Sequence, residues 1–392
     1  MSVTARIVGQ SPVKLWGLDA EERLRRQLKS TGVCLDDTGD HILLLRADHL
    51  FETRTIASLL AQPGTVLRCP RDGKRAAALV EASHAEAATT ALLDTDTELP
   101  QQLREITPED LARFDVSLRR AAPPLLEPLS EERRVALEDQ LYGNAYKGIT
   151  DLVTKWMWPK PAKRIVRWCA ANGITPNAVT AVSFLLTLAA ALLFVRGHFA
   201  LGLAAGWLMT LLDTVDGKLA RVTVQSSRFG HYFDHGIDLL HPPVWYLCWG
   251  EAFVELDLLG VMAAPEIYAL ILAGYVGGRV VEGAFHLFAD CSVFGWRPFD
   301  AWFRLVTARR NPCLILLTIA VLAGQPDWGI FAVALWTGFT TLVLLLRLLQ
   351  AVTLRALRGQ RLRSWMSEPD AASRHALSYR TFSSTLGAYA PG

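Results

Sequence analysis

Residues 212–238 read LDTVDGKLARVTVQSSRFGHYFDHGID, and this stretch governs the fold of the chain. It places four aspartates, Asp213, Asp216, Asp234 and Asp238, within strongly apolar sequence. One aspartate at the centre of a bilayer costs about 2.5–3.5 kcal/mol, so four without partners would cost on the order of 10 kcal/mol. That cost rivals the stability of a whole domain. The sequence therefore predicts that other groups compensate these charges.

The spacing of the aspartates indicates how they are compensated. Asp213 and Asp216 are three residues apart and share one helix face, and Asp234 and Asp238, four apart, share another. A short loop between the two helices lets them run antiparallel, so the four carboxylates can converge. Like charges at one point repel unless cations lie among them. Hard oxygen ligands favour Mg²⁺, Mn²⁺ or Ca²⁺, and sites with two such ions typically serve phosphoryl chemistry.

Long apolar segments surround this stretch. A spanning helix needs about 20 mostly apolar residues. The predicted spans, six in number, are residues 178–197, 200–221, 230–254, 265–288, 310–325 and 328–349. Lys and Arg concentrate before the first span, between the fourth and fifth, and after the sixth. The positive-inside rule then predicts a multi-pass protein of the cell (inner) membrane with both termini in the cytoplasm.

The composition divides the chain into parts of different character. We expect a soluble α/β domain at residues 1–135, a linker with an interfacial amphipathic segment at 136–172, a six-helix membrane domain at 173–350 and a basic cytoplasmic tail at 351–392. The net charge of +2, with no basic stripe among aromatics in the first domain, argues against nucleic acid as a partner. The six cysteines form no C-x-x-C pair and no metal-like spacing with histidine, which favours reduced thiols.

A longer motif runs through these aspartates. It reads D-x2-D-G-x2-A-R-x8-G-x3-D-x3-D, and residues 175–180 upstream read TPNAVT. Over about residues 150–350 the chain resembles the CDP-alcohol phosphotransferase family, also called CDP-alcohol phosphatidyltransferases. The resemblance implies a membrane enzyme of phospholipid synthesis that moves a phospho-alcohol group, such as a phosphatidyl group, from a CDP-linked lipid or CDP-alcohol donor to an acceptor hydroxyl and releases CMP. It also implies a homodimer among membrane lipids.

The resemblance assigns roles to residues that match the motif. Asp213, Asp216 and Asp234 are implied metal ligands for two ions, Mg²⁺ or Mn²⁺. Asp238 is implied as a further ligand and as the general base that accepts the proton of the acceptor hydroxyl. Contacts to the CDP group are implied for Pro176, Asn177, Ala178, Val179, Gly217, Ala220, Arg221, Ser227 and Gly230.

The acceptor is left open by the sequence, which allows inositol phosphate, glycerol phosphate or another polyol or polyol phosphate. Arg279 and Glu282 lie inside the fourth predicted span, and an ionisable residue within a membrane is a functional candidate by default. Two roles are open for Arg279: it pairs structurally with Glu282, three residues on, or it binds a phosphate of the acceptor. Lys163, before the first span, is a further candidate for an anionic group or the lipid surface.

The first domain alternates helix-like and strand-like runs, which predicts an α/β fold. Residues 12–17, 21–28 and 45–51 resemble the nucleotidyltransferase domain fused to some family members, with Asp48 at its metal-binding position. No glycine-rich phosphate loop is present near the N-terminus, so we expect a degenerate, inactive domain. The alternatives are a bifunctional cytidylyltransferase/phosphotransferase of the di-inositol-phosphate type and a non-catalytic membrane protein that binds metal.

Overall fold

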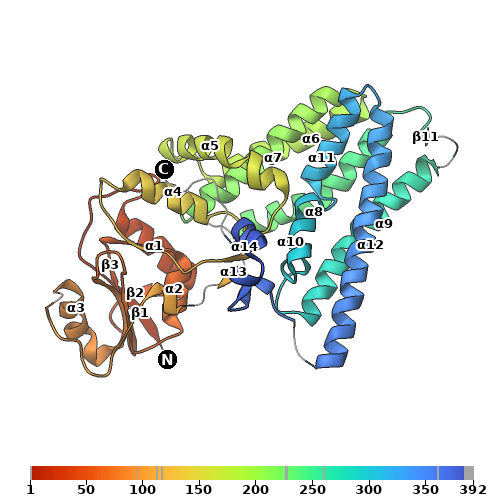
Figure 1. Cartoon of the computed structure of the whole chain (residues 1–392). Helices are drawn as coiled ribbons and strands as arrows, with labels where there is room; N and C mark the ends of the chain where they lie inside the picture. The colour runs from red at the N-terminus through yellow and green to blue at the C-terminus, as the bar shows by residue number, and fades with distance from the viewer. Residues whose placement is uncertain are drawn as a thin grey trace.

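The computed structural model shows an α/β domain beside a bundle of long helices, with α4, α13 and α14 between them (Figure 1). The structure describes residues 2–94, 96–111, 114–115, 118–225, 228–258, 260, 262–359 and 362–383, without the side chains of residues 228–235. The N-terminal α/β fold and the helical C-terminal region both agree with the predicted fold class.

The α/β domain is built on a six-stranded sheet of order β2-β1-β3-β6-β5-β7. Its strands are β1 Val3–Val8, β2 Cys34–Leu35, β3 His41–Arg46, β5 Thr65–Arg68, β6 Arg75–Glu81 and β7 Arg104–Ile106. β1 runs parallel to β2 and β3, whereas β6 is antiparallel to β3 and β5. The central strands are buried on both faces and are therefore almost continuously apolar. Three helices cover the sheet: α1 Ala20–Thr31, α2 Thr53–Leu60 and α3 Ala85–Leu93.

Two short strand pairs complete the domain. β4 His49–Phe51 pairs antiparallel with β10 Leu126–Pro128, and β8 Phe114–Asp115 pairs with β9 Arg120–Ala121. The second pair turns back at Arg119, which has a positive φ of 49°. Such a conformation is uncommon for a residue with a side chain.

The C-terminal region consists of long helices that follow the predicted spans within a few residues, except at the C-terminal end of the last one. They are α6 Pro176–Val195, α7 Phe199–Val222, α8 Arg228–Gly250, α9 Ala264–Phe288, α11 Arg310–Leu322 and α12 Pro326–Arg358. The short helix α10 Pro298–Val306 lies between the fourth and fifth predicted spans. Among the described residues, α6, α7, α9 and α12 are long and apolar enough to cross a membrane, and α10 with α11, bent by 45°, adds up to one more. The predicted count of six is therefore not confirmed.

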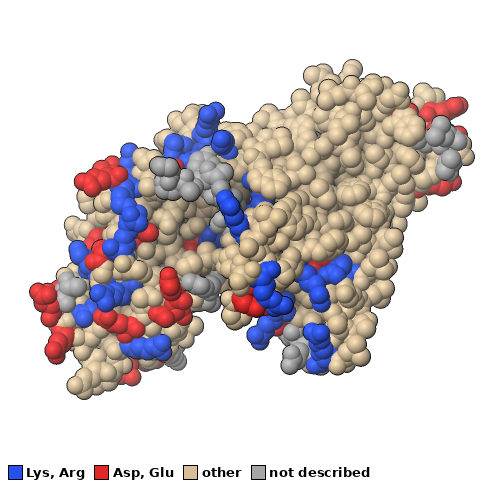
Figure 2. All heavy atoms as spheres, viewed as in Figure 1, with Lys and Arg blue, Asp and Glu red and all other residues tan. Residues whose placement is uncertain are grey.

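The outer surface of the helices suits lipid. Large apolar side chains point outward on several helices, such as Leu185 on α6, Leu201 on α7 and Val280 on α9, each more than 60% exposed. Figure 2 shows the flank of the bundle largely free of charged side chains, which gather toward its ends. Exposed apolar area on this scale would be unfavourable in water. The chain is an integral membrane protein.

The α/β domain is fixed to the end of α7 by two arginines of α1. Arg23 donates from Nη2 to the carbonyl of Val222 at 2.8 Å, and Arg26 donates from Nη1 to the carbonyl of Thr223 at 3.0 Å. The last carbonyls of a helix have no partner within the helix and carry its negative dipole end. The two guanidinium groups satisfy them, so the α/β domain holds the helix that bears Asp213 and Asp216.

Residues 136–172, predicted as a linker and interfacial segment, contain most of α4 Arg134–Asn144, a π-helical turn at Val153–Met157 and α5 Pro159–Ala171. Leu137 of α4 and Val166 of α5 share a buried core with Val215 and Leu219 of α7. The segment is thus part of the folded body next to the aspartates.

The predicted tail is also partly folded. α12 continues to Arg358, nine residues beyond the predicted end of the last span at 349. After it, α13 Ala371–Arg374 and α14 Ala376–Phe382 fold back, and Phe382 is buried in a core with Phe285 and Trp296.

Candidate active site

The carboxylates of Asp213 on α7 and Asp238 on α8 meet at one arginine. Arg310, the first residue of α11, donates from Nη2 to Asp213 Oδ2 at 2.6 Å and from Nη1 to Asp238 Oδ1 at 2.7 Å. The side chains of Arg310 and Asp213 are 15% and 20% exposed, and that of Asp238 is 45% exposed. α7 and α8 therefore bring acidic groups to one cation, and Asp238 is the more exposed of the two carboxylates.

Asp216 adjoins the start of α6. The hydroxyl of Thr180 donates to Asp216 Oδ2 at 2.6 Å and lies 3.1 Å from the carbonyl of Pro176. The helix begins at Pro176 because Thr175 caps it, its hydroxyl accepting from the N–H of Ala178 at 3.3 Å. The TPNAVT segment and the aspartate motif, 36 residues apart at this contact, thus form one surface.

The face of α7 next to these groups carries no side chain at Gly217. A Cβ added at Gly217 would meet only Arg221 Nη1, at 3.6 Å, within 4 Å. Arg221 donates from Nη1 to the carbonyls of Ala145 and Gly217, each at 3.2 Å. A bare backbone beneath an accessible guanidinium is an arrangement that admits a phosphate group.

The remaining predicted contacts are distributed unevenly. Val179 is buried, Asn177 and Ala178 are exposed at the start of α6, and Ala220 is half-buried on α7. Gly230 and Asp234 belong to the part of α8 whose side chains the structure does not describe, and Ser227 lies outside the described residues.

The two candidates for acceptor binding differ in their surroundings. Arg279 lies over the ring of Tyr275 at 5.1 Å and donates to its hydroxyl at 3.2 Å. That hydroxyl lies 3.0 Å from the backbone carbonyl of Leu239 and 3.3 Å from that of Asp238. Arg279 is therefore one side chain away from the candidate base. Glu282 forms its ion pair with Arg309 rather than with Arg279. Lys163 is paired with Asp139 at 2.7 Å.

A group of further cations lies near Asp238: Lys147 interacts electrostatically with Asp238, Arg119 and Arg304, and Arg304 with Arg279. Lys147 has an exposed side chain, yet burial lowers its pKa to about 8, with repulsion from Arg119, Arg221 and Arg304 added and attraction to Asp238 opposing. Burial likewise lowers the pKa of Arg119 to about 10, with Arg304 adding to the shift and Glu282 opposing it.

Arg304 and Arg119 have unused hydrogen-bonding capacity. Nε and Nη1 of Arg304 are buried and have no hydrogen-bond partner among the described residues. Its guanidinium lies over the ring of Phe294 at 5.3 Å. The guanidinium of Arg119 makes no hydrogen bond or ion pair within the described part of the chain.

Sequence reasoning missed Arg310, Lys147, Arg119 and Arg304 as site residues. Arg304 and Arg310 were counted only as positive charges on the inner side, and Arg119 and Lys147 lie outside the motif. The only local signal was a pair of arginines, Arg309 and Arg310, at the edge of an apolar segment, where ionisable residues are costly.

Comparison with known proteins agrees with the geometry. The profile of the CDP-alcohol phosphatidyltransferase family matches residues 173–365. The archaetidylinositol phosphate synthase of Pyrococcus horikoshii is 42% identical over 84 residues, which cover 21% of this chain and 43% of that protein. Cholinephosphotransferase 1 of Gallus gallus is 32% identical over 130 residues, 30% of this chain and 37% of that protein.

A third relative is the phosphatidylinositol phosphate synthase of Mycobacterium marinum, 35% identical over 94 residues, 23% of this chain and 40% of that protein. The chain thus spans less than half the length of each of these three curated relatives. The matched family region contains Asp213, Asp216 and Asp238 together with Arg310, which bridges two of them. Residues 173–365 of this chain are therefore a CDP-alcohol phosphatidyltransferase domain.

Proposed function

We propose that this protein is a membrane transferase that moves a phosphatidyl group from a CDP-linked donor to an acceptor hydroxyl, with release of CMP, in phospholipid synthesis. The observation that carries the proposal is the convergence of Asp213 and Asp238 on one cation, beside Asp216 and inside a domain of this family. The positions of Lys and Arg in the loops support a cytoplasmic location for both termini and for the site.

The side chains present fit divalent metal ions. Asp213, Asp216 and Asp238 offer hard oxygen donors, and the position between two of them already attracts the guanidinium of Arg310. These residues would hold the ions, with Asp234 as the fourth carboxylate of the motif. Bound Mg²⁺ or Mn²⁺ supplies charge neutralisation to a diphosphate.

The protein's own groups then position the two substrates. Arg221 and the bare backbone at Gly217 receive phosphate oxygens of the donor, and the start of α6 lines its nucleotide. Asp238 is more exposed than Asp213, and it accepts the proton of the acceptor hydroxyl. The hydroxyl oxygen bonds to the phosphorus on the lipid side, the bond from that phosphorus to the bridging oxygen breaks, and CMP leaves. Positioning and charge neutralisation carry most of the rate.

The acceptor in this proposal carries a phosphate. Lys147 lies near Asp238, and it forms one group of cations with Arg119, Arg304 and Arg279. Arg119 and Arg304 have unused donors. Charges in such surroundings are costly unless they are paired, and a phosphate monoester pairs them. Two of the three relatives are named for an inositol phosphate product and one for choline. This group of cations favours an acceptor that carries a phosphate over a cationic acceptor.

The experiment is CMP release by the purified protein in lipid nanodiscs with CDP-diacylglycerol and Mg²⁺. Acceptors are inositol phosphate, glycerol phosphate, inositol and choline, and lipid mass spectrometry identifies the product. We expect product with a phosphorylated acceptor and none after chelation of divalent ions. Glu255→Gln, an exposed carboxylate of the loop after α8, serves as the matched control and keeps activity. No CMP release with any pair of substrates would favour the non-catalytic alternative.

One of these cations, Lys147, predicts that binding of the acceptor depends on pH. Lys147, with its pKa lowered to about 8, is charged below that pH and loses its proton above it. We expect KM for the phosphorylated acceptor to rise above pH 8 by up to roughly tenfold per unit, while KM for the donor changes little. The phosphate itself is already doubly charged there.

Lys147→Arg is the control for this effect, because an arginine stays protonated over the same range. A flat profile in Lys147→Arg and a rising one in the native protein are expected. Identical profiles in both would remove Lys147 from the acceptor site.

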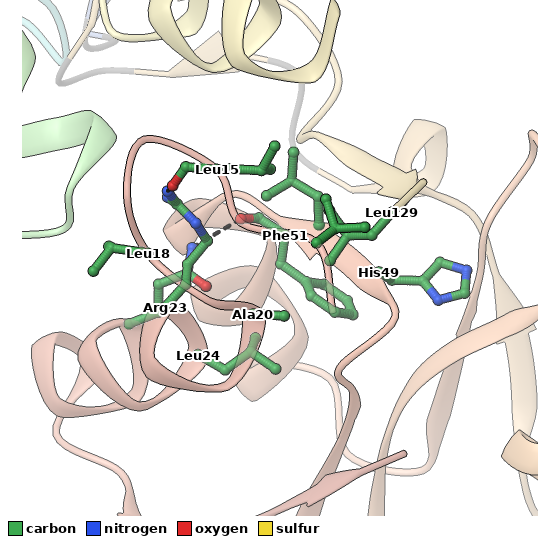
Figure 3. A pocket seen from close by; sticks show the side chains of 11 residues that line it. Leu15, Leu18, Ala20, Arg23, Leu24, His49, Phe51 and Leu129 are labelled. Carbon is green, nitrogen blue, oxygen red and sulfur yellow. Dashed lines mark hydrogen bonds between the residues drawn. The ribbon is translucent and has the colours of Figure 1, made fainter. Parts of the chain in front are cut away.

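The bifunctional alternative receives no support from the α/β domain. Burial alone would raise the pKa of Asp48, but His49 and Arg46 hold it well below its usual value, and Arg46 binds both of its oxygens, at 2.9 and 2.5 Å. Asp48, at the position of a metal ligand in a nucleotidyltransferase, is thus already paired with Arg46. The small pocket in Figure 3 is lined mostly by apolar side chains, among them Leu15, Leu24 and Phe51. We propose that this domain does not make the CDP-alcohol.

A further inference from the structure

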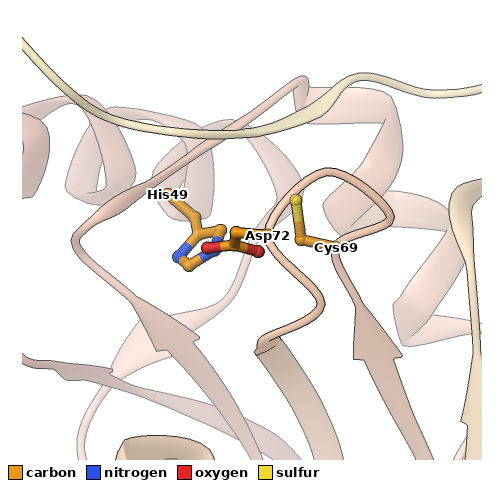
Figure 4. Close-up of side chains that lie close together, drawn as sticks. All are labelled: His49, Cys69 and Asp72. Atoms are coloured by element: carbon orange, nitrogen blue, oxygen red, sulfur yellow. The ribbon is translucent and has the colours of Figure 1, made fainter.

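Three metal-ligating side chains meet in the α/β domain, away from the membrane site. His49 begins β4, Cys69 directly follows β5, and Asp72 lies in the turn before β6. Their ligand atoms all lie within 4.8 Å of one another, and Figure 4 shows the carboxylate of Asp72 against the ring of His49, with Cys69 beside them. His49 and Cys69 are buried, at 2% and 0% exposure, whereas the side chain of Asp72 is 21% exposed.

The imidazole of His49 lies between two carboxylates. Its Nδ1 is 2.8 Å from Asp48 Oδ1 and its Nε2 is 3.2 Å from Asp72 Oδ2. A neutral imidazole carries one N–H and can donate to only one of them. The other contact sets a ring lone pair against a carboxylate oxygen unless a cation lies between, either a second proton or a metal ion.

The position of Cys69 favours the metal ion. A second proton on His49 would satisfy Asp72, and the Cys69 thiol has a weak hydrogen bond of its own, at 3.9 Å from the carbonyl of Leu126. What a proton does not explain is the approach of a sulfur ligand atom to the same centre as the imidazole and the carboxylate. Zinc binds sulfur at ~2.3 Å, imidazole nitrogen at ~2.0 Å and carboxylate oxygen at ~2.0–2.2 Å. Tetrahedral sites of these lengths place their ligands roughly 3.3–3.8 Å apart, close to the 3.2 Å between His49 and Asp72. A mixed set of sulfur, imidazole and carboxylate ligands suits zinc better than Mg²⁺.

The groups around the cluster hold the ligands in place. Asp48 fixes the ring of His49 through Nδ1, and Arg46 in turn holds Asp48 by two hydrogen bonds. A carboxylate behind a ligating histidine is the usual support of a zinc site.

The turn between β5 and β6 is equally ordered. The N–H of Cys69 donates to the carbonyl of Lys74 at 2.8 Å, and that of Gly73, whose φ is +73°, donates back to Cys69 at 3.0 Å. The N–H of Lys74 also donates to Asp72 Oδ1 at 3.1 Å. Cys69 and Asp72 are therefore presented together from one rigid loop.

We propose that His49, Cys69 and Asp72 bind one Zn²⁺ ion, with a water molecule at the fourth position on the side of Asp72. The ion takes the place of the Nε2 proton and keeps Cys69 as a thiolate. It joins β4 to the β5–β6 turn, and through the pairing of β4 with β10 it ties the end of the domain to the chain that leads into α4. Because His49 and Cys69 are 20 residues apart, no sequence spacing announced this site.

The test uses the full-length protein in detergent, stripped of metal and then dialysed against Co²⁺ with excess Mg²⁺ to fill the membrane carboxylates. We expect one Co²⁺ per chain and a sulfur-to-cobalt charge-transfer band in the near ultraviolet, displaced by stoichiometric Zn²⁺. Cys69→Ser should lose the band and bind at least roughly 100-fold more weakly. Cys34→Ser, at an exposed cysteine, should retain both.

Asp72→Asn provides a second variant, because its side chain lies in an exposed turn and its loss leaves the core intact. This variant should keep the charge-transfer band and bind Co²⁺ more weakly than the native protein. A band that persists in Cys69→Ser, or metal bound equally by every variant, would mean adventitious binding and would overturn the proposal. A native protein that binds no Co²⁺ would assign the Nε2 contact to a proton instead.

Discussion

Asp213→Asn is expected to lower CMP release by about 10³-fold or more, a loss typical of removing a charged group that faces the reacting phosphates. Asp213 and Asp238 share one guanidinium, so they lie at one point where positive charge collects. An amide in place of Asp213 keeps the shape of the side chain but offers no charge to a divalent ion. The metal concentration for half-maximal activity should therefore rise as the maximal rate falls.

The measurement is single-turnover CMP release over a range of Mg²⁺ concentrations. Asp238→Asn should show a similar loss of rate with a smaller shift in metal dependence, because it also removes the proton acceptor. Glu255→Gln again supplies the control, since it removes an exposed carboxylate outside the aspartate motif. Activity of Asp213→Asn within a few-fold of the native protein would exclude this residue as a metal ligand.

Arg310→Met is expected to destabilise the metal-free protein strongly and the Mg²⁺-bound protein little. Removal of one partner from a buried ion pair costs about 3–5 kcal/mol because the other charge stays buried. Here the loss should lie at the low end of that range, since Asp238 is 45% exposed and water screens its charge. A divalent ion between the carboxylates replaces the lost cation, so Mg²⁺ should restore most of the melting temperature.

Arg347→Met is the matched control. Arg347 holds the buried carboxylate of Asp300 through two hydrogen bonds, at 2.6 and 2.8 Å. The same type of pair is lost there, outside the aspartate motif, and Mg²⁺ should not compensate. Thermal unfolding of both variants with and without Mg²⁺ decides the question. An equal response to Mg²⁺ in the two variants would show that Arg310 does not neutralise a metal site.

Much of the membrane domain could be predicted because its signals are local. Apolar segment length predicts where α6, α7, α9 and α12 lie, and i, i+3 spacing puts Asp213 and Asp216 on one face. The predicted end of α12 was less accurate. Arg355 and Arg358 continue a helix that composition alone would end at the membrane surface. The number of spans stays a prediction.

The sequence was a poorer guide to which charged residues pair with one another. Glu282 was considered a partner for Arg279 on the same helix, but it pairs with Arg309 of the loop before α11, and Arg279 turns to Tyr275. Spacing along one helix identifies possible partners and does not rank them against residues that arrive from elsewhere.

The sequence by itself determined that acidic groups lie in an apolar setting and need cations, because the cost of charge in lipid acts on each residue where it stands. Only the tertiary structure decided which cations pair with these acidic groups. Arg310 is 97 residues from Asp213 and 72 from Asp238, and Arg119 and Lys147 come from before the first span. Contacts over such distances depend on how helices pack and where the α/β domain docks, which no local pattern encodes.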